Sequence, residues 1–251
     1  MVRIDKGPAP HGMGPVAKKL LSDYHVINAK KPSLTISKYW ADVRSKLDPF
    51  VDVLKERSHS KCAYCESKIG STAHPHVEHY KPKMRFEALT FAWTNWLLSC
   101  GVCNQTKWSH FPMCGPVPCL IDPASEDPTG HVDFAGVFPV GLTPRGEKTI
   151  ELTSIDRSSL ETERSLWLSR VDFLLLLMLN PASRAAARDL LLWALKPSAP
   201  YSSMTRAYLL DVAPKLALSP AASPAMTLDD AELQIRDLAH SFGASLPGGA
   251  S

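Results

Sequence analysis

The 251-residue chain has no long apolar run and no recognisable secretion signal. Its most apolar stretch, residues 173–179, is far shorter than the about 20 residues that a membrane-spanning helix needs, and we expect it to be a buried helix. The first residues lack the apolar segment and small-residue cleavage site of a signal peptide. These absences argue against membrane-embedded and secreted classes and predict a cytoplasmic protein.

The chain also has few glycines and a small net charge. It has 13 glycines against 21 prolines, which predicts many short elements and ordered loops rather than a continuous sheet. A net charge of +3 permits nucleic-acid binding but does not by itself indicate it. Charged residues make up 21% and hydrophobic residues 45%, as in ordinary globular proteins with a real core.

Pattern and composition divide the chain into five segments without an internal repeat, and together they predict an α+β fold. These are a basic, mainly helical lead-in (1–60), a unit with unusual chemistry (61–112), an irregular Pro/Gly-rich connection (113–155), a helical region (156–242) and a disordered tail (243–251). Helices are expected at 36–47, 50–57, 158–179, 184–195, 203–211 and 228–242, and short strands at 132–134 and 149–152. Asp48-Pro49 is expected to interrupt the first helical stretch, and Ser158–Glu161 to form a capping box.

Two Cys-x-x-Cys pairs, Cys62/Cys65 and Cys100/Cys103, are separated by 34 residues. Two intervening residues let both thiolates of a pair reach one tetrahedral ion, and two such pairs complete a closed zinc site. A reducing compartment favours metal binding over disulfides. We therefore predict a structural zinc ion that clamps the intervening element, with reduced, buried cysteines as the alternative.

Cys114 and Cys119 do not have the Cys-x-x-Cys spacing. We expect them to be ordinary cysteines, with accessory redox chemistry as the alternative.

The stretch from residue 59 to residue 110, which includes both cysteine pairs, is rich in groups suited to phosphodiester hydrolysis. Five of the nine histidines lie between residues 59 and 110, beside Glu78, Asn95 and Asn104. Hydrolysis of a phosphodiester needs a base for water, a hard cation for the phosphate, and cations that hold the backbone. Large aromatic side chains in this unit are expected to be core rather than base-stacking surfaces: Tyr80, Phe86, Phe91, Trp93 and Trp96.

The order of these residues resembles the motif of HNH (ββα-metal) endonucleases framed by zinc knuckles. The positions that carry the resemblance are Glu78-His79-x-x-Pro82-Lys83, then Asn95, then Cys100-x-x-Cys103-Asn104-x-x-Lys107. The match covers residues 62–107. The resemblance implies two antiparallel strands and a helix around one divalent ion.

The resemblance also implies a role for each motif position. His79 would be the general base that activates water, and Glu78 would bind the catalytic ion. Asn95 would hold the hairpin and orient the base, while Asn104, a common variant at the third position, would bind the ion through its side-chain oxygen. Oxygen ligands favour Mg²⁺ or Mn²⁺. Phosphate contacts are expected from three lysines: Lys81, Lys83 and Lys107.

The sequence leaves a structural alternative open at each position. Glu78 could pair with Lys81 or Lys83 instead of a metal, and His79 could be a loop histidine bonded to a carbonyl. The lysines could form a solvated basic face.

The two asparagines could instead cap helices. Asn95 would then precede or begin a helix, and Asn104 would cap the helix after the second cysteine pair. His76 is expected to be a loop residue that lies close enough in sequence to be a spare ligand.

Further segments resemble one bacterial HNH subfamily over roughly residues 1–170. They are Cys62–Glu66, Val77–Lys83, Asn95–Cys100, Phe111-Pro112 and Leu120–Pro123. The subfamily includes the HNH subunit of Septu antiphage systems (PtuB) and of some retron defence systems. It implies a nuclease gated by an ATPase partner with an SMC/ABC-like head (PtuA). The region 158–242 is the expected docking surface, although it could equally be the protein's own core.

The sequence therefore predicts a metal-dependent endonuclease with DNA as its substrate. A nuclease that cuts RNA such as tRNA is an alternative, because the mechanism needs no 2′-hydroxyl. A non-catalytic, zinc-stabilised nucleic-acid-binding module is another, but it explains the cysteines and not Glu78-His79 with Asn95 and Asn104.

Overall fold

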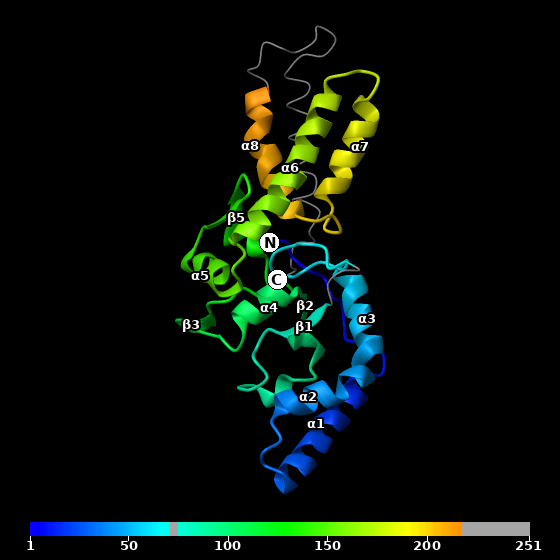
Figure 1. Cartoon of the computed structure of the whole chain (residues 1–251), viewed down its shortest axis with the longest axis vertical. Helices are drawn as coiled ribbons and strands as arrows, with labels where there is room; N and C mark the ends of the chain where they lie inside the picture. Colours follow the sequence, from blue (N-terminus) through cyan, green and yellow to red (C-terminus); the bar gives the residue numbers. More distant parts are fainter. Residues whose placement is uncertain (71–74, 217–251) are drawn as a thin grey trace, which may run out of the picture.

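The computed structural model describes residues 1–70 and 75–216, which form an elongated α+β molecule (Figure 1). Helices α1 and α2 form one end, strands β1 and β2 with helix α4 lie in the middle, and helices α6 to α8 form the other end. The α-helices are α1 (Met13–Lys30), α2 (Ile36–Val43), α3 (Asp48–Arg57), α4 (Gly101–Lys107), α5 (Pro144–Thr153), α6 (Ser158–Met178), α7 (Arg184–Leu195) and α8 (Ser202–Leu216). The 3₁₀ helices are η1 (Arg44–Leu47), η2 (Glu87–Leu89), η3 (Trp93–Asn95) and η4 (Pro128–Gly130).

The strands of the described residues form three antiparallel pairs, β1–β2, β3–β4 and β5–β6. Their bounds are β1 (His76–His79), β2 (Trp96–Ser99), β3 (Met113–Cys114), β4 (Val117–Pro118), β5 (Val132–Ala135) and β6 (Phe138–Gly141). In the first pair His76 lies opposite Ser99, and His79 lies opposite Trp96. The whole of β2 is buried, so this hairpin passes through the interior with α4 directly after it.

The N-terminal helices follow the expected apolar spacing, with one difference. Thr35 caps α2 by accepting a hydrogen bond from the backbone nitrogen of Lys38 at 3.3 Å. The helix expected at 36–47 is an α-helix only to Val43 and continues as the 3₁₀ helix η1, and Asp48-Pro49 begins α3, with proline in its first turn. Proline lacks an N–H and has a fixed φ, so it fits the first turn, where that N–H would have no partner.

The connection at 113–155 is more ordered than expected. A strand is confirmed at 132–134, within β5, and its partner β6 was not predicted. The strand expected at 149–152 is wrong, because these residues belong to α5. Thr143 caps this helix by accepting from the Gly146 nitrogen at 3.1 Å, and Pro144 follows it. The start signal outweighs the strand preference of Thr149 and Ile150.

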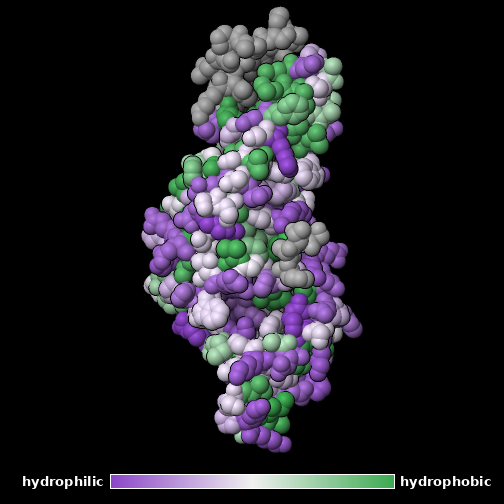
Figure 2. Space-filling model, viewed as in Figure 1, coloured by the Kyte–Doolittle hydropathy of each residue, from purple (hydrophilic) through white to green (hydrophobic). Residues whose placement is uncertain are grey.

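Helix α6 begins one residue away from the expected cap. Its N-cap is Arg157, which makes no capping hydrogen bond, and Ser158 is already helical, so the capping box is wrong. The run 173–179 is only half buried, because one stripe of the helix faces inward while Phe173 and Leu176 are 60% and 64% exposed. Figure 2 shows apolar side chains gathered at this end of the molecule.

The other C-terminal helices agree with the expected ranges where the structure describes them. Helix α7 spans the predicted 184–195, and α8 contains 203–211. The helix expected at 228–242 and the tail at 243–251 lie outside the described residues.

The main hydrophobic core crosses the boundaries between the expected segments. It joins side chains from the N-terminal helices, the β1–β2 hairpin, the 113–155 connection, and the beginnings of α6 and α8, including Leu54, Trp96, Ile121, Leu160 and Met204. A second, smaller cluster lies between α6, α7 and α8. The central hairpin is thus held on several sides by the rest of the chain.

Candidate active site and metal centre

Four thiols meet beside the β1–β2 hairpin. The Sγ atoms of Cys62, Cys65, Cys100 and Cys103 all lie within 4.8 Å of one another, and those of Cys65 and Cys100 are 3.8 Å apart. A tetrahedral zinc ion with bonds of about 2.3 Å holds its sulfurs about 3.8 Å apart, so the four thiols fit such an ion. Within residues 1–70 and 75–216 no other group of three or more His, Cys, Asp or Glu side chains comes this close.

Local backbone geometry positions both cysteine pairs. Glu66 has a φ of 62°, in the left-handed region, so the chain reverses directly after the first pair. The nitrogen of Ala63 donates to the Leu98 carbonyl at 2.8 Å and ties this turn to β2. Cys100 directly follows β2 and caps α4, where its Sγ accepts from the Cys103 nitrogen at 3.5 Å. Both cysteine pairs are therefore anchored to β2.

Arg157, at the start of α6, points its guanidinium at the same sulfurs. Its Nη1 donates to Cys103 Sγ at 3.5 Å, and its Nη2 to Cys100 Sγ at 3.9 Å. A divalent ion with four thiolates carries a net charge of about −2, which this cation offsets. The thiol cluster is thus linked to the C-terminal helices, which the spacing of the cysteines did not indicate.

The two remaining cysteines correct the sequence-based expectation. Cys114 and Cys119 are joined by a disulfide and are not free. The β3–β4 hairpin brings their Cα atoms to 4.9 Å, within the range that a disulfide can span. Sequence separation alone could not show this approach.

A groove of about 820 Å³ lies between α2 and the hairpin with α4. From the central unit it is lined by His76, Glu78, His79, Lys83 and Asn104. Trp40 and Arg44 line it from the side of α2. The three motif positions expected to act together, Glu78, His79 and Asn104, therefore share one groove.

The His79 side chain is held as a neutral imidazole. Its ring is 4% exposed, and Nε2 lies 2.9 Å from the Thr90 carbonyl oxygen. Because a carbonyl only accepts, Nε2 must carry the proton, and Nδ1 keeps its lone pair. Trp40 packs edge-on against the ring at 4.6 Å between centroids. Burial, aided by the charge of Lys83, lowers the pKa of His79 to about 3, so the ring is neutral at ordinary pH.

Glu78 is a buried carboxylate held by a buried lysine. It is 3% exposed, and its Oε1 forms an ion pair with Nζ of Lys107, which is fully buried. The same Nζ donates to the His79 carbonyl at 2.9 Å. Burial raises the pKa of Glu78 to about 7, against the opposing effect of Lys107. The sequence suggested Lys81 or Lys83 as the ion-pair partner of Glu78. In the structure the partner is Lys107.

The three lysines expected to bind phosphate are placed differently from one another. Lys83 lines the groove, and Lys81 is half-buried, with its Nζ 5.9 Å from the centre of the Phe86 ring. Lys107 is enclosed between α4 and β1, where a substrate phosphate has no access to it. The expectation for Lys107 is therefore corrected: it positions Glu78 and β1.

Asn95 joins the chain just after β1 to the loop that leads into β2. Its Oδ1 accepts from the Lys81 nitrogen at 2.7 Å, and its Nδ2 donates to the carbonyls of Lys81 at 3.0 Å and Leu89 at 3.2 Å. It lies in η3 and makes no capping bond there. These bonds fix the loop after His79, so Asn95 is a positioning residue rather than one that touches substrate.

Asn104 lies inside α4 and is not a helix cap. Its side-chain nitrogen is 3.3 Å from Nδ1 of His76, and both residues line the groove. Turning the amide by half a rotation would present its oxygen to the groove, because the two amide atoms are nearly equivalent in shape.

The aromatic side chains of this unit are mainly core, as expected. Tyr80, Phe91, Trp93 and Trp96 are each less than 8% exposed, and Phe86 is half buried. Sequence reasoning missed Trp40 and Thr90, which hold the base. The helical spacing of α2 gave Trp40 a place on an apolar face, but no local pattern marked the Thr90 carbonyl.

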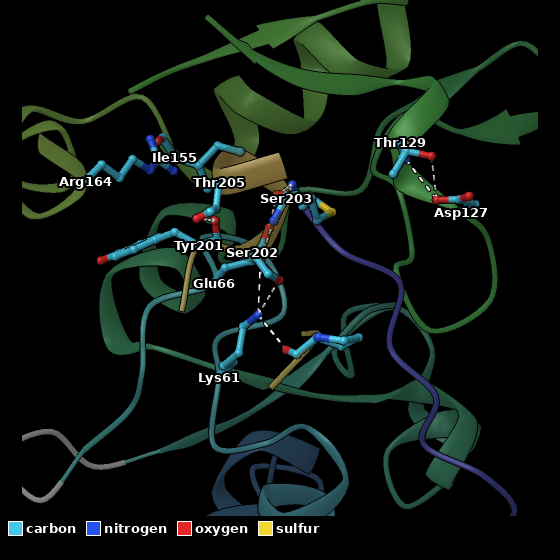
Figure 3. Close-up of polar contacts among 12 residues, drawn as sticks. Lys61, Glu66, Asp127, Thr129, Ile155, Arg164, Tyr201, Ser202, Ser203 and Thr205 are labelled. Carbon is cyan, nitrogen blue, oxygen red and sulfur yellow. Dashed lines mark hydrogen bonds and ion pairs between the residues drawn. The ribbon is translucent and has the colours of Figure 1, made fainter. Parts of the chain in front are cut away.

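A second buried charge cluster joins the first cysteine turn to α8 (Figure 3). Glu66 is 2% exposed and forms ion pairs with Lys61 and with the amino group of Met1, each at 3.1 Å. The hydroxyls of Ser202 and Ser203 also donate to it. Burial alone would raise the pKa of Glu66, but Lys61 and the amino group hold it well below its ordinary value. This cluster fixes the thiol turn against the C-terminal helices.

The groove also fits a hard divalent ion. Glu78 Oε1 is buried and, apart from its ion pair, receives no hydrogen bond of good geometry. A buried carboxylate and an amide side chain in one groove offer the kind of oxygen atoms that Mg²⁺ or Mn²⁺ prefers. Glu78 and Asn104 would be the residues that hold such an ion.

Comparison with known families gives a match for the central unit. Residues 62–109, which contain the hairpin, α4 and both cysteine pairs, match the family model for HNH endonucleases. The predicted resemblance is thereby confirmed for this part of the chain.

The chain is also similar to a curated protein. It is 29% identical over 168 residues to the Septu protein PtuB of Bacillus mycoides (strain KBAB4). The match covers 55% of this chain and 57% of that protein, so it spans little more than half of the relative's length. Over the matched part the chain is thus similar to PtuB. No helix among the described residues is long and apolar enough to cross a membrane.

Proposed function

We propose that this chain is a metal-dependent endonuclease that hydrolyses phosphodiester bonds of DNA. One observation carries the proposal: His79, with its Nδ1 lone pair available, shares a groove with Glu78 and Asn104. The match of residues 62–109 to HNH endonucleases supports the same chemistry.

Two different ions are proposed for the two metal sites. Zinc suits the four-thiol cluster and has a structural role there, because four protein ligands leave no position for water. Mg²⁺ or Mn²⁺ suits the groove, where Glu78 and Asn104 would bind it.

We assign the central step to His79. The bond from Nε2–H to the Thr90 carbonyl fixes the ring, so Nδ1 would take the proton from a water molecule whose oxygen attacks phosphorus. The bond from phosphorus to the leaving sugar oxygen then breaks, and that oxygen takes a proton from solvent. Thr90 then stabilises the imidazolium, because its carbonyl oxygen continues to accept from Nε2. A bound divalent ion supplies charge neutralisation at the phosphate and the leaving oxygen. Lys83, which lines the groove, and Lys81, two residues before it, would contact neighbouring phosphates.

The proposal is tested by offering the purified chain supercoiled plasmid, single-stranded DNA and tRNA with Mg²⁺ or Mn²⁺. Nicking or linearisation of the plasmid that stops on addition of EDTA and returns with Mg²⁺ is expected. Cleavage of tRNA alone would replace DNA by RNA as the substrate. Binding of all three without cleavage, also in the presence of the partner proposed below, would favour a zinc-stabilised binding module.

We further propose that the protein acts in the cytoplasm in antiphage defence, gated by an ATPase subunit of the PtuA type. The similarity to a Septu protein supports this setting. The region 158–242 is proposed to include the docking surface. In its described part, an apolar groove of about 460 Å³ lies between α6 and α7, with Phe173, Leu190 and Trp193 exposed at its edges.

Docking is tested by substitution rather than deletion, because removing this region would also remove Ser202 and Ser203, whose hydroxyls bond to Glu66. Phe173→Asp combined with Leu190→Asp should weaken co-purification with the ATPase at least about tenfold, since buried aromatic anchors dominate interfaces. Ser165→Asp, an exposed change elsewhere on α6, is the matched control. Full retention of the ATPase by the double variant would contradict docking at this groove.

The pH dependence of cleavage should report Glu78. Because burial raises its pKa to about 7, its carboxylate is lost as the pH falls through 7, and cleavage at limiting Mg²⁺ should fall with it. His79 does not contribute to this limb, since its pKa of about 3 keeps it neutral. Lys107→Met removes the neighbouring cation, so the limb should move upward by about one pH unit.

The Lys107 prediction is checked by pH–rate profiles of variants whose melting curves show a folded protein. Lys81→Met is the control, because it should lower the rate without moving the limb. A limb that stays in place in Lys107→Met would assign it to another group.

A further inference from the structure

His76 lies in the groove although it is outside the HNH motif. It begins β1, two residues before Glu78, and side chains two apart on a strand point to the same face. Both residues line the groove. The strand therefore presents an imidazole and a carboxylate side by side to the proposed ion site.

The ring of His76 is oriented toward Asn104. A Cβ placed on Gly101 would lie 3.4 Å from Nε2, so that edge of the ring packs over the first residue of α4. The Nδ1 edge faces the Asn104 amide, 3.3 Å from its nitrogen. Neighbouring ligands of an octahedral ion with bonds of about 2.1 Å lie about 3 Å apart. One ion could therefore replace this hydrogen bond once the amide turns its oxygen toward Nδ1.

We propose that His76 is a third protein ligand of the catalytic ion, through Nδ1, together with Glu78 and Asn104. This inference rests on the proposed function, which places a divalent ion in the groove. One imidazole among oxygen ligands shifts the preference of a site from Mg²⁺ toward Mn²⁺ and other transition ions. The site is then a mixed nitrogen–oxygen site with a preference for Mn²⁺.

The test is pulsed EPR of Mn²⁺ bound to the full chain, with the four-cysteine site loaded with zinc. A directly coordinated imidazole gives a ¹⁴N coupling, expected in the wild type and in His79→Ala and absent in His76→Ala. The Mn²⁺ dissociation constant should rise at least about tenfold in His76→Ala, because even outer partners of ligands change affinity by 10–100-fold. The ratio of cleavage rates with Mn²⁺ and Mg²⁺ should move toward Mg²⁺.

The outcomes separate this inference from the proposed function. Mn²⁺ bound in the groove without ¹⁴N coupling, or a coupling lost in His79→Ala and kept in His76→Ala, would overturn the role of His76 and leave the nuclease standing. Absence of Mn²⁺ binding in the wild type would overturn the proposed ion site itself. If His76→Ala does not fold, His76→Gln replaces it, since an amide fills similar space without a ring nitrogen.

Discussion

His79→Ala is expected to reduce cleavage by roughly 10²–10⁴-fold, the contribution of a positioned general base. The substitution removes the Nδ1 lone pair and leaves the ion ligands of the groove in place. Initial rates of plasmid nicking, measured at saturating Mg²⁺ or Mn²⁺, give the size of the loss. His110→Ala is the matched control, because His110 is exposed and lies outside the groove.

The loss must come from chemistry and not from unfolding. His79 is buried against Trp40, so its truncation leaves a cavity that costs stability. His79→Gln is a second variant that keeps an amide donor for the Thr90 carbonyl and has no basic nitrogen. A folded Gln variant that retains its rate within threefold of the wild type would remove His79 from the role of base.

Cys103→Ser is expected to unfold the central unit. Cys103 is fully buried, it belongs to the four-thiol cluster, and Arg157 donates to its sulfur. Structural zinc contributes on the order of 10 kcal/mol to folding in small domains. Losing one of four ligands should lower the melting temperature by more than about 10 °C, given a few degrees per kcal/mol for a chain of this size. The bound zinc should fall below one ion per chain.

Zinc content by elemental analysis and thermal melting check this prediction together. Cys114→Ser is the matched control, because Cys114 lies outside the cluster and should leave the zinc content unchanged. A Cys103→Ser protein with native melting and a full zinc ion would show that the cluster is not a structural metal site.

The central unit was predictable because its chemistry is encoded by short spacings. Two residues between cysteines fix the reach of two thiolates, and the motif from Glu78 to Asn104 fixes the order of strand, strand and helix. The family match to residues 62–109 covers the same stretch.

Contacts between distant residues were not predictable in this way. Lys107 pairs with Glu78, 29 residues away, only because α4 packs against β1, and nothing in the sequence shows which lysine turns inward. The disulfide between Cys114 and Cys119 likewise depends on a hairpin that was not foreseen. The strand predicted at Thr149–Leu152 does not form, because α5 starts after the Thr143 cap, six residues earlier, and extends through these residues.

Because the core is shared, the central unit depends on side chains from the rest of the chain. Although the family motif ends near residue 109, the base is held by Trp40 from upstream and the thiol cluster by Arg157 from downstream. Glu66 likewise accepts hydrogen bonds from the hydroxyls of Ser202 and Ser203 on α8. The unit that matches the HNH model is thus packed against the rest of the chain on several sides and is not a separate, appended domain. A transplant of residues 62–109 into another scaffold would carry the motif but leave behind the side chains that hold it.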